Sequence, residues 1–179
     1  LTPQAIAYWM KAGQRSMERS ASAEAVSHLR RGLELLASLP DTPERCAQEL
    51  GMQLPLGTAL ITWQGYAAPE VGPIFARAQE LCLKIADTPT LVAVLWGIWA
   101  WREVREEMQI CKTLAAEIMK VAEAQADEGI LMEALFVPAQ TAFYCGDFLK
   151  AREYFEKELT LYHTERCAAW SRHTGQNSG

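Results

Sequence analysis

The apolar residues of this chain recur with the period of an α-helix, and prolines divide the pattern at regular places. No stretch alternates apolar and polar residues as a half-buried strand does. The triplets 41–43 and 87–89 both read Asp-Thr-Pro, and each ends one segment and begins the next. The pattern predicts eight helices over residues 3–18, 23–39, 44–63, 69–85, 90–103, 106–125, 130–145 and 148–162. We expect Ser22 to cap the second helix and Pro55 to kink or interrupt the third.

The predicted helices come in pairs, and the pairs recur about every 40 residues, a spacing typical of an α-solenoid. In a solenoid each hairpin buries its apolar face against its neighbours. The last pair carries the clearest motif: Gly146 permits a left-handed helix end and Asp147 caps the next helix. Ala151 is small where the two helices cross, and Phe155, one turn later, fills the groove between them.

This motif, with Phe148 after the aspartate, resembles the turn and second helix of a tetratricopeptide repeat. Trp9, Ala12 and Gly13 resemble the first helix of that repeat. Further matching positions are Ala25, Leu29, Gly32, Leu56, Gly57, Phe75, Ala78, Trp96, Gly97 and Cys111. The fourth pair departs from the pattern, with Pro138 and Ala139 in place of leucine and glycine. The resemblance implies an all-α fold: a right-handed superhelix of about four helix-turn-helix pairs over residues 1–162, followed by a polar tail or linker at 163–179.

Four segments, 5–13, 23–36, 65–71 and 95–99, are similar to the tetratricopeptide-like region of large bacterial signalling ATPases. In that family a cyclase-like or other effector domain often precedes an AAA-type ATPase domain, and the helical repeats follow. The resemblance implies that the chain is one module of such a protein or a short relative. The chain has no Walker A motif and no cyclase-like aspartate pair, so the catalytic parts of the family do not transfer. The polar end resembles a linker into a further repeat, which implies an uncapped last pair through which the chain forms homodimers or aggregates.

In a tetratricopeptide stack the first helix of each pair lines a concave face that binds a partner. The resemblance places on that face Gln14, Glu18, Thr58, Trp101, Arg102, Gln140, Phe143 and Tyr144. Aromatic and arginine side chains are common anchors for a bound segment. The alternative for Trp101 and Phe143 is packing against the next repeat. The loop from Trp63 to Tyr66 is a second candidate, with a plug folded back on the protein as its alternative.

We therefore expect a protein–protein interaction or regulatory scaffold whose partner is a protein or peptide, within the parent protein or outside it. The alternative is a sensor that binds a peptide or small ligand in the concave groove. Catalysis has little support, because the three histidines are far apart and the acidic pairs 106–107 and 127–128 lie at turns. His163, Cys167 and His173 match no rigid metal site, so we expect no metal and no cofactor.

The bulk composition excludes other classes of function. The net charge of -5 disfavours a nucleic-acid partner, which needs a basic stripe. The apolar stretch 91–101 is about half of what a membrane span needs, and the N-terminus has no signal-peptide pattern. The five cysteines, Cys46, Cys82, Cys111, Cys145 and Cys167, form no CxxC pair and are odd in number. We expect them to be buried and reduced, which predicts a cytoplasmic protein.

Overall fold

The computed structural model describes residues 2–162, which contain eight α-helices and no strand. The helices are α1 (Thr2–Glu18), α2 (Ser22–Leu36), α3 (Pro43–Gln64), α4 (Val71–Ile85), α5 (Thr88–Glu103), α6 (Met108–Gln125), α7 (Glu128–Tyr144) and α8 (Phe148–Leu161). The expected all-α class is confirmed, and every predicted helix is present with bounds that differ by at most three residues. The predicted tail at 163–179 lies outside the described residues.

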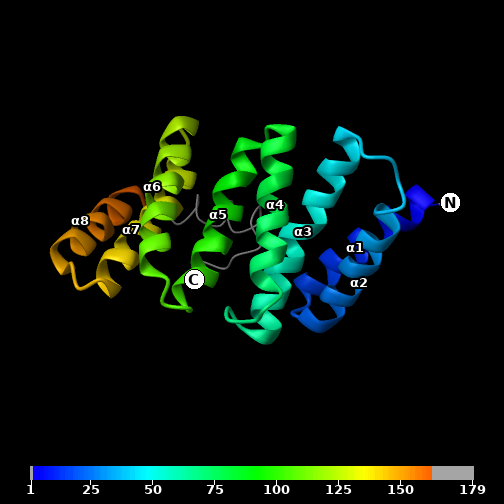
Figure 1. The fold of residues 1–179 in the computed structure, drawn as a ribbon, viewed down its shortest axis with the longest axis horizontal. Coiled ribbons are helices and arrows are strands. Elements are labelled where there is room, and N and C mark those ends of the chain that lie inside the picture. Colours follow the sequence, from blue (N-terminus) through cyan, green and yellow to red (C-terminus); the bar gives the residue numbers. More distant parts are fainter. Residues whose placement is uncertain (1, 163–179) are drawn as a thin grey trace. The chain divides into compact units, whose positions relative to one another are not determined.

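The described helices form two compact units, one ending at Asp87 and the other beginning at Thr88. In the first unit α1 packs on α2, α2 on α3 and α3 on α4, and α1 also touches α3. In the second unit α5 packs on α6, α6 on α7 and α7 on α8, and α5 also touches α7 (Figure 1). Each unit is therefore a stack of two helical hairpins in which the first helices of the two hairpins meet.

Glycines let the two helices of a hairpin approach closely in the first unit. A Cβ added to Gly13 of α1 would lie 2.7 Å from the side chain of Leu29 on α2. A Cβ added to Gly57 of α3 would likewise lie 2.7 Å from the ring of Phe75 on α4. Leu29 and Phe75 are both buried. The two hairpins thus make the same contact, glycine against a large buried side chain, between positions that the tetratricopeptide resemblance matches.

The second unit is an internal repeat with an offset of 40 residues. Helices α5 and α7 begin 40 residues apart, and so do α6 and α8. The turns inside the hairpins follow the same offset, because Glu106 and Gly146 both have positive φ, 60° and 79°. Asp147 caps α8, since its Oδ1 accepts a hydrogen bond from the Lys150 backbone N–H at 3.2 Å. The left-handed glycine and the capping aspartate are therefore confirmed.

A chain of aromatic contacts ties the hairpins of the second unit together. The Trp99 indole is buried, and its Nε1 donates a hydrogen bond to Thr141 Oγ1 at 2.9 Å. The Trp99 ring meets Phe136 of α7 at a centroid distance of 6.1 Å, and Phe136 meets Phe155 of α8 at 6.3 Å. Ala151 of α8 is buried, as the repeat motif predicts.

Three local expectations were wrong in whole or in part. Helix α3 runs through Pro55 without the expected interruption, because proline removes only one backbone hydrogen bond and buried neighbours such as Met52 hold the helix in place; the alternative, a kink at Pro55, stays a prediction. Ser22 is the first residue of α2 rather than its cap, and the backbone closes that turn through Ala21 N–H and Ser16 C=O. Cys145 is exposed because it lies at the end of α7.

The other described cysteines fit the expectation. Cys46, Cys82 and Cys111 are buried and form no disulfide. Burial raises the pKa of Cys82 to about 12 and that of Cys111 to about 11, so both thiols stay protonated and inert at neutral pH.

Candidate binding surfaces

The predicted binding residues of the second unit lie at the C-terminal ends of α5 and α7. The Gln140 side chain donates a hydrogen bond to Glu103 Oε2 at 2.9 Å, which joins the two helix ends. The guanidinium groups of Arg102 and Arg105 lie 4.7 and 4.8 Å from the centroid of the Trp101 ring. Trp101 and Arg102 therefore form one cation–π cluster, held close to Gln140 by the adjacent Glu103.

Phe143, Tyr144 and Phe148 form a second cluster, which we call the aromatic edge. The Phe143 ring lies 5.6 Å from both the Tyr144 ring and the Phe148 ring. The three side chains are nevertheless 51%, 60% and 63% exposed. Mutually touching rings that stay more than half exposed are typical of an interaction surface. Phe148 was missed as a binding residue because the candidates were taken only from the first helix of each pair, whereas Phe148 begins the second helix of the last pair.

The cation–π cluster at the end of α5 contains two buried polar atoms, on Arg102 and on the adjacent Glu103. Arg102 Nε and Glu103 Oε1 are buried and have no hydrogen-bond partner among the described residues. Burial raises the pKa of the Glu103 carboxyl, and the Gln140 hydrogen bond opposes that rise. Arg102 also pairs with Glu107. The end of α5 thus keeps a donor and an acceptor with unused hydrogen-bonding capacity beside the cation–π cluster.

The predicted binding residues of the first unit do not form a cluster. Gln14 and Glu18 are exposed and lie one turn apart on α1. Thr58 is half-buried, and its hydroxyl donates a hydrogen bond to the Leu54 carbonyl inside α3. Trp63 and Tyr66 are both exposed, but only Tyr66 lies in the loop after α3, because the helix extends to Gln64 and includes Trp63. Each of these residues is described within its own unit, so a concave face shared by all eight predicted residues remains a prediction.

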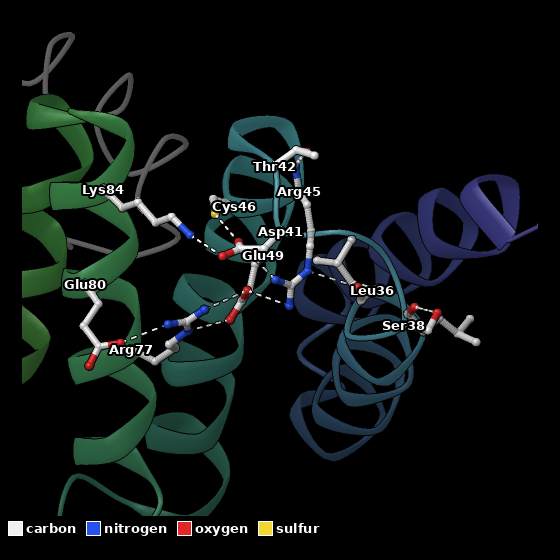
Figure 2. A network of polar contacts seen from close by, with 11 residues as sticks. Leu36, Ser38, Asp41, Thr42, Arg45, Cys46, Glu49, Arg77, Glu80 and Lys84 are labelled. Carbon is white, nitrogen blue, oxygen red and sulfur yellow. Dashed lines mark hydrogen bonds and ion pairs between the residues drawn. The ribbon is translucent and has the colours of Figure 1, made fainter.

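A polar network connects α2, α3 and α4 in the first unit (Figure 2). The Glu49 side chain is 10% exposed, and its carboxylate accepts hydrogen bonds from Arg77 Nε at 2.7 Å and from Arg77 Nη2 at 3.1 Å. Arg45 Nη2 lies 3.4 Å from the same carboxylate, and Arg45 Nε donates to the Leu36 carbonyl at 3.1 Å. The Glu49 bonds raise the pKa of Arg77. The buried charge is therefore compensated from two sides.

At the solvent-exposed side of the network, the Asp41 carboxylate also has hydrogen-bond partners. Lys84 Nζ lies 2.6 Å from Asp41 Oδ2, and the Cys46 thiol donates to Asp41 Oδ1 at 3.3 Å. The Lys84 bond is the main reason that the pKa of Asp41 is lowered. Because these groups partner one another, the network fastens α4 to α3 and to the loop before α3. We interpret it as structural rather than as a binding site.

The second unit also contains a groove between α6 and α8, with a volume of about 580 Å³. It is lined by Lys112, Ala115, Ala116 and Met119 of α6, by Pro138, Thr141, Ala142 and Cys145 at α7, and by Asp147, Lys150 and Tyr154 at α8. The α7 residues recur every three or four positions, so they share one face of that helix. Gln140, Phe143 and Tyr144 fall roughly half a turn away, so the groove and the aromatic edge use opposite faces of α7.

A pair of acidic side chains occupies positions that are apolar in the preceding hairpin. With the 40-residue offset, Glu133 of α7 corresponds to Ala93 of α5, and Glu158 of α8 corresponds to Ile118 of α6. Ala93 and Ile118 are buried. Burial raises the pKa of Glu133 to about 7, with a further contribution from the charge of Glu158, whose own pKa is raised by burial. The last hairpin therefore carries two carboxyls at positions where the preceding hairpin buries apolar side chains.

The described residues hold no group of three or more histidine, cysteine or acidic side chains able to bind a metal ion. His163, Cys167 and His173 lie outside that part of the chain. His28 has a structural environment, with Ser16 Oγ 3.2 Å from its Nδ1 and Trp9 against its ring. Among residues 2–162, no helix is long and apolar enough to cross a membrane. Neither the family models nor the curated proteins compared with this chain include a match.

Proposed function

We propose that this chain is a protein-interaction scaffold of the tetratricopeptide type that binds a partner segment at the ends of α5 and α7. The observation that carries the proposal is the aromatic edge, whose three rings contact one another and stay more than half exposed. Aromatic rings bury a large area on binding and lose few side-chain rotations. Arg102, whose buried Nε has no partner among the described residues, supplies a polar anchor on the neighbouring helix end.

The resemblance to bacterial signalling ATPases extends this proposal. The four hairpins then form one right-handed superhelix, and the chain is a fragment or relative of a larger cytoplasmic protein. Its partner is another part of that protein, a separate protein, or a second copy bound through the last hairpin. The repeated glycine contacts and the 40-residue internal repeat support this proposal, because duplicated hairpins produce both. We assign the chain no enzymatic activity of its own.

A selection from random 12-residue peptides displayed on phage tests the proposal, because it assumes nothing about the sequence of the partner. We expect enriched peptides whose affinity falls at least tenfold in Phe143→Ala and in Tyr144→Ala, the loss typical of a hot spot. The matched control is Trp63→Ala, because Trp63 is as exposed as Phe143 but lies in the first unit. The proposal fails if no peptide is enriched, or if the control variant loses as much affinity as the two test variants.

A further inference from the structure

We propose that the groove between α6 and α8 is a second binding site, which takes an acidic peptide segment of a partner protein. Apolar side chains of the segment lie on the groove floor, and its carboxylates pair with Lys112 and Lys150. The site goes beyond the proposed function, because it lies on the face of α7 that points away from the aromatic edge.

The groove carries two lysines, Lys112 and Lys150, that form no ion pair among the described residues. The ion pairs of the described residues engage Arg30, Arg31, Arg45, Arg77, Lys84, Arg102, Arg105 and Arg152. Lys112 and Lys150 take part in none of these pairs, although the chain has an excess of acidic residues. Both lysines lie near the N-terminal ends of their helices, where the helix dipole adds positive potential.

The lining contains one carboxylate, which is already engaged. Asp147 Oδ1 accepts the Lys150 backbone N–H at 3.2 Å and so serves as the cap of α8. None of the ion pairs of the described residues joins this carboxylate to the ammonium group of Lys112 or Lys150. Within residues 2–162, the groove presents two cations that no ion pair compensates, and a ligand with the complementary charge is acidic.

The groove floor is built mainly from small or adaptable apolar side chains. Ala115, Ala116 and Ala142 leave space, and Met119 adjusts to what fills it. Thr141 offers no free group, because its hydroxyl donates to the Val137 carbonyl and accepts from Trp99 Nε1. An inorganic anion has no apolar group that could pack against such a floor, so the floor would add nothing to its binding free energy. A segment with apolar and acidic side chains matches both the floor and the rim.

The residues that follow Tyr162 in the chain are a poor occupant on charge. Residues 163–179 contain Arg166, Arg172 and two histidines against the single acidic residue Glu165. A segment of that composition is repelled by a lysine rim. Residues 163–179 therefore do not supply the complementary segment.

An array of random 12-residue peptides with net charges from about -4 to +4 tests the charge requirement. We expect the bound peptides to be acidic with apolar residues, and their affinity to fall at least tenfold in the double variant Lys112→Glu/Lys150→Glu. The matched control is Lys120→Glu, since Lys120 is exposed on α6 and does not line the groove. Circular dichroism of both variants verifies that they fold. Binding of neutral or basic peptides alone, or equal losses in the control, overturns the proposal.

The exposed thiol of Cys145 reports whether a peptide occupies the groove. In a Cys167→Ser background we expect bound acidic peptides to slow the alkylation of Cys145 by iodoacetamide at least fivefold. The same peptides should retain their affinity for Phe143→Ala, which separates this site from the aromatic edge. An unchanged alkylation rate, or a loss of affinity in Phe143→Ala, contradicts the assignment. Equal protection by a synthetic peptide with the sequence of residues 163–179 also contradicts it.

Discussion

Replacing Glu133 with glutamine should stabilise the protein, and the gain should depend on pH. Burial beside Glu158 raises the pKa of Glu133 from an ordinary value near 4.5 to about 7. A tenfold change in proton affinity corresponds to about 1.4 kcal/mol, so the full cost of ionising Glu133 in the folded state is about 3 kcal/mol. Because the side chain keeps some access to solvent, we expect about half of that, roughly 1.5 kcal/mol.

Because the pKa of Glu133 is raised in the folded protein, this side chain makes the protein less stable as the pH rises. The folded protein holds this proton more tightly than the unfolded chain, so the neutral carboxyl favours folding below about pH 4.5. That contribution is lost as the pH rises through about 7. Glutamine has nearly the same shape and never ionises, so the Glu133→Gln variant avoids the loss.

Urea unfolding at two pH values, followed by far-UV circular dichroism, measures the effect. At pH 8.5 the Glu133→Gln variant should exceed the wild type by about 1.5 kcal/mol in free energy of unfolding, and at pH 5 by less than about 0.5 kcal/mol. The matched control is Glu153→Gln, an exposed position on α8, which should show no such dependence. A difference that is equal at both pH values, or a variant less stable than wild type at pH 8.5, refutes the reasoning.

Three further substitutions test the packing and the polar contacts. Gly57→Ala should lower the free energy of unfolding by about 1–3 kcal/mol, because the new Cβ would press on the buried Phe75 ring. Gly51→Ala should raise it by about 0.5–1 kcal/mol, because no atom lies within 4 Å of the new Cβ and alanine favours a helix. Thermal melts distinguish the two. Arg77→Ala should lower the free energy of unfolding in urea by about 1–2 kcal/mol, because the buried Glu49 carboxylate loses two hydrogen bonds. Arg152→Ala breaks only the exposed pair with Glu156, so it should cost less than about 0.5 kcal/mol. Gln140→Ala should cost about 1–2 kcal/mol by the same assay, because the Glu103 carboxylate loses its donor.

Local chemistry explains what the sequence could predict. Gly146 and Asp147 act within one turn, so their roles follow from residue type and order. The contact of Gly13 with Leu29 was equally accessible, because the repeat pattern matches a small residue on one helix to a large residue on the next. The helix bounds follow from caps and prolines for the same reason.

Features that depend on how several helices pack could not be predicted. The groove between α6 and α8 exists because small residues such as Ala115 and Ala142, far apart in the sequence, line the same space. The burial of Glu133 depends on which face of α7 meets α8, and periodicity alone does not distinguish it from an exposed glutamate. The continuity of α3 through Pro55 is likewise decided by the side chains packed around it.

The central claim is that a partner segment binds at the ends of α5 and α7, and amide chemical shifts of ¹⁵N-labelled protein test it most directly. Titration with a peptide selected on phage should move the signals of Arg102, Gln140 and Tyr144 and leave those of Glu49 and Arg77 in place. Shifts confined to the first unit, or an unchanged spectrum at saturating peptide, would contradict the account.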